Sequence, residues 1–187
     1  MLYTITVEGF ISGVKIECVK GDITNQRGIN AIVNAANAQL TRGGGVSGAI
    51  HRAAGSELEK ECRRLAPIKT GEAVITPGYK LPNQYVIHCL GPRYGVDKPE
   101  AELLARCYRN ALKLAEEYKL ESVAFPAIST GVFGYPTEEA ANVAFRTVLD
   151  VASGLKHVKK IRFVLYNDED YEVHKKVLSS MMKTKEE

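Results

Sequence analysis

A pair of asparagines and a run of glycines form the segment of this chain best suited to chemistry on a polar ligand. Asn34 and Asn37 follow a β-branched pair at residues 32–33, and Gly43–Gly45 come shortly afterwards. Amide side chains at the end of a strand can donate and accept hydrogen bonds without carrying charge. Consecutive glycines allow the backbone to approach a ligand and direct several N–H groups at one anion. The segment therefore suits sugar hydroxyls and phosphate oxygens.

A second donor-rich loop follows residues 122–125, which have the pattern of a strand. Ser129, Thr130 and Gly131 offer hydroxyl and backbone donors, and Thr137 is placed to cap the next helix. A helix N-terminus that follows such a loop attracts phosphate, so the two loops together predict a diphosphate held between them. Neither glycine cluster is followed by Gly-Lys-Ser/Thr or spells G-x-G-x-x-G, which excludes the Walker loop and the dinucleotide fingerprint.

Several of these polar residues also have a purely structural interpretation. Asp22 could cap a turn, and Asn34 and Asn37 could simply form turns. The triple glycine could be an ordinary loop. Tyr166 ends a predicted strand, so a place in the core or sheet is the first interpretation and a ligand contact is the alternative.

The histidines are assigned structural roles. His51 and His88 have no paired carboxylate and no metal-ligand spacing in the sequence, and catalytic or metal-binding histidines need such partners. Cys89 follows His88, but adjacent residues of a strand point to opposite faces. The two therefore do not form a nucleophile pair.

The elements that position these loops alternate between strands and helices. Strand patterns cover Tyr3–Glu8, Val14–Val19, Ile29–Val33, Glu72–Thr76, Tyr85–Leu90, Ser122–Phe125 and Lys160–Tyr166. Helical patterns cover Val46–Ala54, Glu57–Leu65, Pro99–Tyr118, Thr137–Val151 and Glu169–Met182, with Asp168 as the candidate N-cap of the last helix. This order predicts an α/β fold, in which a mixed and mostly parallel sheet lies between two helix layers. Ligands of such sheets bind beyond the carboxyl ends of the strands.

Composition is that of one globular domain. The chain has 187 residues and a net charge of +3, which is too small to indicate nucleic-acid binding. No apolar run approaches the roughly 20 residues of a membrane span, and the N-terminus lacks the features of a signal peptide. The four widely separated cysteines predict reduced, mostly buried thiols in a cytoplasmic protein without a metal site. The tail at residues 183–187 is expected to fray.

The joint pattern of motifs resembles a macro domain over nearly all of residues 1–187, close to the MacroD-type hydrolase branch. The matching segments, in chain order, are Gly21–Thr24, Ala31–Asn37, Gly43–Val46, Ala49–Gly55, Thr70–Ala73, Val86–His88, Gly91-Pro92 and Ala124–Gly134. The resemblance implies a single three-layer domain that binds ADP-ribose, free or attached to a protein, without a metal or other cofactor. It also implies hydrolysis of ADP-ribose from acidic side chains or deacetylation of O-acetyl-ADP-ribose.

The resemblance also assigns roles to individual residues. Asp22 would accept a hydrogen bond from the adenine amino group, Ile23 would donate from its backbone, and Tyr166 would pack on the adenine ring. Asn34 and Asn37 would line the distal ribose. One wall around the phosphates and distal ribose would consist of Gly43, Gly44, Gly45 and Val46. The other wall would consist of Ser129, Thr130, Gly131, Val132 and Phe133. The catalytic positions would be Asn34, Asn37, Gly45 and Ser47.

Three positions depart from the MacroD-type pattern. Ser47 stands where that branch has an aspartate, and a positioned general base is worth about 10²–10⁴-fold in rate. Asn167 stands where relatives commonly have aspartate. Arg42 replaces a glycine, and it could either contact a phosphate or point to solvent.

Three functions therefore remain open. The chain is either an ADP-ribosyl hydrolase or a non-catalytic reader of ADP-ribosylated proteins or poly-ADP-ribose. RNA binding is the third, weaker hypothesis. A scattered set of lysines favours it slightly, but without interleaved aromatics a solvated face is the simpler interpretation.

Overall fold

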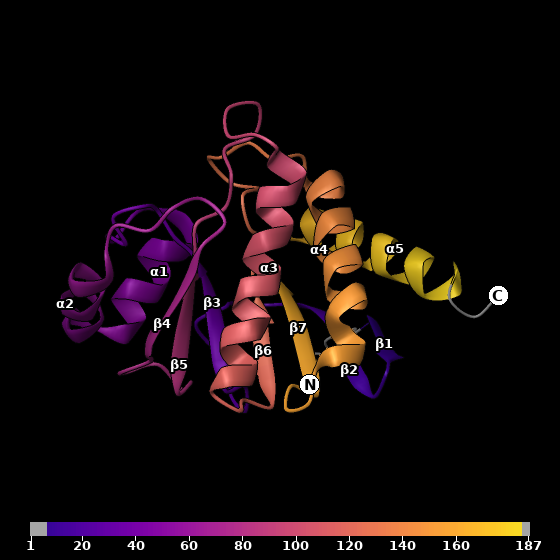
Figure 1. Cartoon of the computed structure of the whole chain (residues 1–187), viewed down its shortest axis with the longest axis horizontal. Helices are drawn as coiled ribbons and strands as arrows, with labels where there is room; N and C mark the ends of the chain where they lie inside the picture. Colours follow the sequence, from indigo (N-terminus) through magenta and orange to yellow (C-terminus); the bar gives the residue numbers. More distant parts are fainter. Residues whose placement is uncertain (1–6, 185–187) are drawn as a thin grey trace.

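The computed structural model describes residues 7–184, whose strands form one seven-stranded sheet (Figure 1). The strands are β1 (Val7–Ile11), β2 (Val14–Lys20), β3 (Ala31–Ala35), β4 (Ala73–Pro77), β5 (Tyr85–Cys89), β6 (Ser122–Phe125) and β7 (Lys160–Leu165). Their order across the sheet is β1-β2-β7-β6-β3-β5-β4. Only the outer pairs β1–β2 and β4–β5 are antiparallel within this described part of the chain, and the inner strands are parallel. The prediction of a mixed, mostly parallel sheet is confirmed.

Helices cover both faces of this sheet. They are α1 (Gly45–Ala54), α2 (Ser56–Leu65), α3 (Glu100–Glu117), α4 (Thr137–Val151) and α5 (Asp168–Thr184), with a 3₁₀ turn at Ala152–Gly154. Buried side chains of α3, α4 and α5 form one core with one face of the sheet, and those of α1 and α2 form a second core with the other face. In Figure 1, α3 and α4 lie side by side in front of the strands. The three-layer α/β prediction is confirmed.

The two cores follow directly from strand periodicity. Successive side chains of a strand point to opposite faces. Val33 accordingly belongs to the α3–α5 core and Ile32 to the α1–α2 core. Phe163 and Val164 of β7 divide in the same way. A continuous apolar strand is what a sheet covered on both faces requires.

Two predicted strands are displaced in the structure. Of the predicted strand Tyr3–Glu8, residues 3–6 lie outside the described part of the chain, and the described strand runs on from Val7 to Ile11. The predicted strand Ile29–Val33 is instead Ala31–Ala35. Asn30 lies before it, and its Oδ1 accepts hydrogen bonds from the backbone N–H groups of residues 121 and 122. The other boundaries differ from the predictions by at most two residues.

Three predicted helix starts are also corrected. Thr137 is the first residue of α4 and does not cap it, because the N-cap position is Pro136. Pro99 occupies the N-cap position of α3 and lies just before the first helical turn. At α5 the cap is Asn167, whose Oδ1 accepts a hydrogen bond from the Asp170 N–H at 2.8 Å, whereas Asp168 is the first helical residue. Of the predicted frayed tail, residues 183 and 184 are helical, and 185–187 lie outside the described residues.

A buried polar cluster surrounds His88 between β5 and its neighbours. His88 Nδ1 lies 3.1 Å from Asn34 Nδ2, and His88 Nε2 lies 2.9 Å from Thr76 Oγ1. Cys89 points to the opposite face, into the α3–α5 core, which confirms that the two adjacent residues do not face each other. All four cysteines are free and buried, as predicted. Burial lowers the pKa of His88 to about 3, so the buried imidazole is neutral at neutral pH.

The pKa of His88 predicts acid sensitivity of the fold. In the unfolded chain the imidazole titrates near pH 6.5, so below that pH the unfolded state binds a proton that the folded state refuses until about pH 3. The free energy of unfolding should therefore fall by roughly 2–3 kcal/mol between about pH 6 and about pH 4 from this group. Urea unfolding at both pH values measures the fall. His88→Gln should reduce it by that amount, and the same substitution at the half-buried His157 serves as control. An unchanged pH dependence in His88→Gln would contradict the assignment.

None of the helices within residues 7–184 is long and apolar enough to cross a membrane.

Candidate functional site

A cavity of about 800 Å³ opens at the carboxyl ends of the inner strands. Its walls are the segments that follow β2, β3, β6 and β7, together with the first turns of α1. Because β2, β7, β6 and β3 are parallel neighbours, their carboxyl ends share one edge of the sheet. The site residues predicted from the sequence line this cavity with one exception, namely Asp22, Ile23, Asn37, Gly43, Gly44, Gly45, Val46, Ser47, Ser129, Thr130, Gly131, Val132, Phe133 and Tyr166.

Asp22 both forms a turn with Thr24 and lines the cavity. Its Oδ1 accepts hydrogen bonds from the Thr24 N–H at 2.8 Å and the Thr24 hydroxyl at 2.7 Å. Such a turn fixes the orientation of the carboxylate at the cavity wall. Within residues 7–184, Oδ2 has no such bond, so this second oxygen is the one available to accept a hydrogen bond from a ligand.

Asn37 is held against the next turn of the same loop. Its Nδ2 donates to the Thr41 hydroxyl at 3.0 Å, and its Oδ1 accepts from the Thr41 N–H at 3.1 Å. The side chain lies at the cavity wall beside Gly43, where an added Cβ would come within 3.5 Å of Nδ2. The amide is therefore positioned before any ligand arrives.

Ser47 occupies the first turn of α1 and is buried at the cavity. Its hydroxyl donates to the Thr41 carbonyl oxygen at 3.3 Å. The N–H groups of this first turn have no partner within the helix, and the helix dipole makes this end positive. Gly48 brings the helix against the glycine loop, because a Cβ there would lie 2.6 Å from the Gly43 carbonyl oxygen. The arrangement presents several backbone donors to an anion in the cavity.

The second wall is the loop after β6, and Gly91 determines how it packs. A Cβ at Gly91 would lie 2.1 Å from Ser129 Oγ, so only glycine allows the loop to come this close. Ser129 is buried, and within residues 7–184 its hydroxyl has no hydrogen-bond partner. Thr130 donates from its hydroxyl to the Ala127 carbonyl oxygen at 2.8 Å, which closes the turn. Ser129, Thr130 and Gly131 all line the cavity, so this loop forms a polar wall of it.

Tyr166 is exposed at the mouth of the cavity, with 81% of its surface accessible. The interpretation of Tyr166 as a core or sheet residue is therefore wrong. β7 ends at Leu165, so Tyr166 is the first residue beyond the sheet. An exposed aromatic ring at a cavity mouth can stack on a planar ligand.

Asn34 is the exception among the predicted site residues. It lies inside β3 and is fully buried, and its side chain bonds His88 on the neighbouring strand rather than lining the cavity. The strand extends two residues further than the sequence predicted, so Asn34 falls on a core-facing position. We find no geometric support for its expected contact with the ligand.

Other cavity residues were not singled out from the sequence. Arg52 lines the cavity from α1, on the same helix face as Gly45 and Gly48. That i, i+3, i+7 spacing is a signal that could have identified it. Asp170 also lines the cavity at the start of α5, beside Asn167, which the sequence marked only as a departure from the MacroD-type pattern. Arg42 does not line this cavity and instead borders a separate pocket.

Both the sequence and the fold of this chain are similar to those of known proteins. A family model described as "Macro domain" matches residues 33–144. The chain is 48% identical over 170 residues to a Salmonella typhimurium protein named O-acetyl-ADP-ribose deacetylase, covering 88% of this chain and 94% of the relative. It is 47% identical over 168 residues to mouse ADP-ribose glycohydrolase MACROD2, covering 88% of this chain and 35% of that protein. A solved Oceanobacillus iheyensis macrodomain with ADP superposes with a TM-score of 0.93 at 41% identity, over 98% of this chain and all of that one.

Proposed function

Because this chain belongs to the macro domain family, we propose that it binds ADP-ribose in the 800 Å³ cavity and hydrolyses ADP-ribose conjugates. Its substrates are proteins mono-ADP-ribosylated on acidic side chains, O-acetyl-ADP-ribose, or both. The observation that carries the proposal is the cavity itself, in which two donor-rich loops face each other between an acidic residue and an exposed aromatic ring.

The cavity supports one orientation of the ligand. Adenine lies between Tyr166 and Asp22, whose free Oδ2 accepts from the exocyclic amine while the backbone of Ile23 donates nearby. The diphosphate lies between the N-terminus of α1 and the loop after β6. Backbone N–H groups at both places suit phosphate oxygens. The distal ribose then reaches Asn37 and Phe133.

Hydrolysis in this orientation needs a positioned water and an acceptor for its proton. Asn37 orients the distal ribose and the attacking water. A phosphate oxygen of the substrate accepts the proton of that water, because Ser47 has no carboxylate to do so. The oxygen of that water bonds at the ester, and the bond that joins the acyl group to the distal ribose breaks. The acidic side chain or acetate leaves as a carboxylate, and ADP-ribose is released with its hydroxyl restored.

A second function is favoured by Ser47 alone. Without a carboxylate at this position the domain would bind ADP-ribosylated proteins and release nothing, which is the behaviour of a reader. Both functions require binding of ADP-ribose, and a measurement of turnover distinguishes them.

We also propose a cytoplasmic location, which the free, buried thiols support because reduced cysteines are typical of reducing compartments.

The proposed adenine contact is tested by substitution of Asp22. Asp22→Ala should weaken ADP-ribose binding by roughly 10–150-fold, the equivalent of about 1.5–3 kcal/mol for a hydrogen bond to a charged group. Isothermal titration calorimetry measures the dissociation constant directly.

Asp22→Asn is the matched variant for this test. An asparagine Oδ1 can still accept from Thr24 and preserve the turn, but the amide nitrogen places a donor against the adenine amine. Both variants should therefore bind weakly. If Asp22→Asn bound as tightly as the unaltered chain, Asp22 would serve the turn only.

A further inference from the structure

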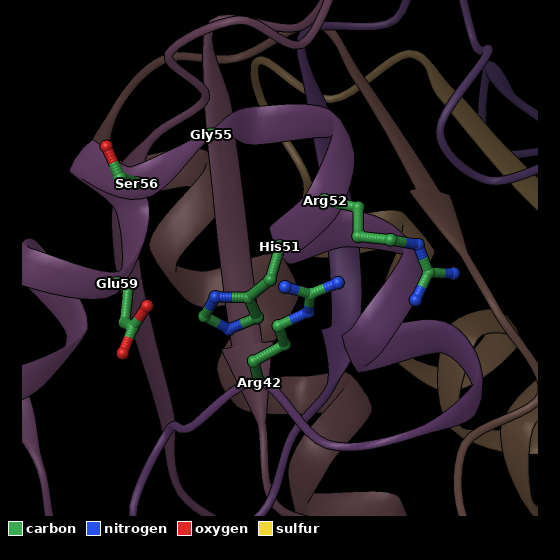
Figure 2. A pocket seen from close by; sticks show the side chains of 6 residues that line it. All are labelled: Arg42, His51, Arg52, Gly55, Ser56 and Glu59. Carbon is green, nitrogen blue, oxygen red and sulfur yellow. The ribbon is translucent and has the colours of Figure 1, made fainter.

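A second, smaller pocket of about 280 Å³ lies between α1 and α2. It is lined by Arg42, His51, Arg52, Gly55, Ser56 and Glu59 (Figure 2). Arg52 also lines the large cavity, so the two pockets adjoin at this residue. None of the roles proposed above uses the side chains that give the smaller pocket its chemistry.

His51 is the first sign that the pocket takes a ligand. The residue is 5% exposed, and within residues 7–184 neither ring nitrogen has a hydrogen-bond partner. A buried polar group without a partner is costly, and a ligand that supplies the partner removes that cost. Figure 2 shows the imidazole between the side chains of Glu59 and Arg42. Burial lowers the pKa of His51, so the neutral ring offers one N–H donor.

The N-terminus of α2 supplies further donors. Gly55 precedes this ten-residue helix, and no side chain caps it. The amide of Leu58 bonds to the Gly55 carbonyl oxygen, whereas the amides of residues 56 and 57 belong to the first turn, which has no helical partners. Ser56, the first residue of α2, also lines the pocket. Backbone donors and a positive dipole end favour an anion here.

The charged side chains that line the pocket are mainly positive, which also favours an anion. Arg42 is exposed and carries its guanidinium beside the His51 ring (Figure 2), and no carboxylate of the described residues forms an ion pair with it. Arg52 extends away from the ring in the same view. Glu59 is the one acidic residue among those lining the pocket, and its carboxylate is paired with Arg63 at 2.8 Å. An unpaired arginine, an unpartnered imidazole and a helix N-terminus thus converge.

We propose that this pocket binds a small oxyanion, a phosphate or carboxylate group, held by Arg42, the N–H of His51 and the α2 N-terminus. The exposed Arg42 side chain moves aside to admit the group to the ring and then pairs with it. The oxyanion is either a free ion or an acidic group carried by the macromolecule whose ADP-ribose occupies the adjoining cavity.

Inorganic phosphate is the probe for the first test, with the whole chain labelled with ¹⁵N and the large cavity saturated with ADP-ribose. We expect saturable shifts of the Ser56 and Glu57 amide signals and of the His51 ring nitrogens. Arg42→Gln should weaken this binding by about tenfold, as expected for loss of one charge-assisted hydrogen bond. Arg146→Gln, at an exposed position of α4, is the matched control and should bind as the unaltered chain does.

Two results would overturn the proposal: signals of Ser56 and Glu57 that do not saturate, or equal dissociation constants for Arg42→Gln and Arg146→Gln. Because Arg42 is a surface side chain, this variant tests the site without the folding risk of replacing the buried His51. If ADP-ribose itself failed to bind, the titration would be repeated without it. Shifts at Ser56 would then still report this pocket, and shifts at Gly131 would report the large cavity, so the two proposals fail separately.

Enzyme kinetics distinguish the two sources of the oxyanion. This experiment rests on the proposed function. If the group belongs to the modified protein, Arg42→Gln raises KM for an ADP-ribosylated protein and leaves KM for O-acetyl-ADP-ribose unchanged. If the group is a free ion, the variant has equal KM effects on the two substrates.

Discussion

Replacing Asn37 by alanine is expected to lower the rate of ADP-ribose release at saturating substrate by about 10²-fold, the loss typical of a misplaced reacting group. The amide is fixed by two hydrogen bonds to Thr41 at the cavity wall, which gives it a defined direction toward the distal ribose. Without this amide, neither the attacking water nor the ribose is held in position for the reaction. Binding should change much less than turnover, because adenine and diphosphate are held elsewhere. Single-turnover kinetics together with calorimetry separate the two effects.

Thr41→Val is the control for the Asn37 variant. It keeps the shape of the side chain and removes the hydroxyl that bonds the amide, while the backbone N–H of Thr41 still donates to Asn37 Oδ1. If Asn37 serves only to brace this loop, Thr41→Val and Asn37→Ala should be similarly impaired. We expect Thr41→Val to retain most of the turnover, and a shared loss would contradict the role of Asn37 in orienting the substrate.

Replacing Ser47 by aspartate is expected to raise turnover by about 10²-fold, the lower end of the gain from a positioned general base. Position 47 is buried at the cavity in the first turn of α1, where the helix dipole stabilises a carboxylate. Arg52 lines the same cavity from the next turns and adds a favourable charge. The new carboxylate gives the attacking water a second acceptor besides the substrate phosphate.

Ser47→Asn is the matched variant for the Ser47 substitution, with the same shape as aspartate and no charge. Both variants lose the hydrogen bond from the serine hydroxyl to the Thr41 carbonyl oxygen, so the comparison isolates the carboxylate. A rate for Ser47→Asp no higher than that for Ser47→Asn would show that position 47 cannot act as a base in this cavity. The gain is measured as kcat on O-acetyl-ADP-ribose and on a modified protein.

The sequence predicted the fold well where local signals were sufficient. The bounds of α4 and β6 were predicted to the residue, because the apolar helical face of α4 and the short apolar segment of β6 are both local features of the sequence. β3 was misplaced because its end depends on a distant partner. Asn34 stays in the strand since His88, 54 positions away, takes its amide. The pairing with His88 outweighed the turn propensity of asparagine.

The same distinction applies to the site. Asp22, Asn37 and both glycine loops were located from residue type and from their position after strands, since the carboxyl ends of parallel strands meet at one edge. The local pattern left Tyr166 open between a core position and a ligand contact, because an aromatic residue at a strand end has the same pattern in both cases. The pocket around His51 was also beyond sequence reasoning, as its members come from a loop, α1 and α2 and meet only through packing.

The most direct test of the hydrolase proposal is release of ADP-ribose from a protein mono-ADP-ribosylated on glutamate, measured for the unaltered chain and for Asn37→Ala in parallel. We expect release by the unaltered chain, at a rate about 10²-fold higher than that of the variant. Such a result would establish an enzyme that works with serine at position 47. No release by the unaltered chain, with the modified protein still retained by the domain, would contradict the hydrolase proposal and identify a reader.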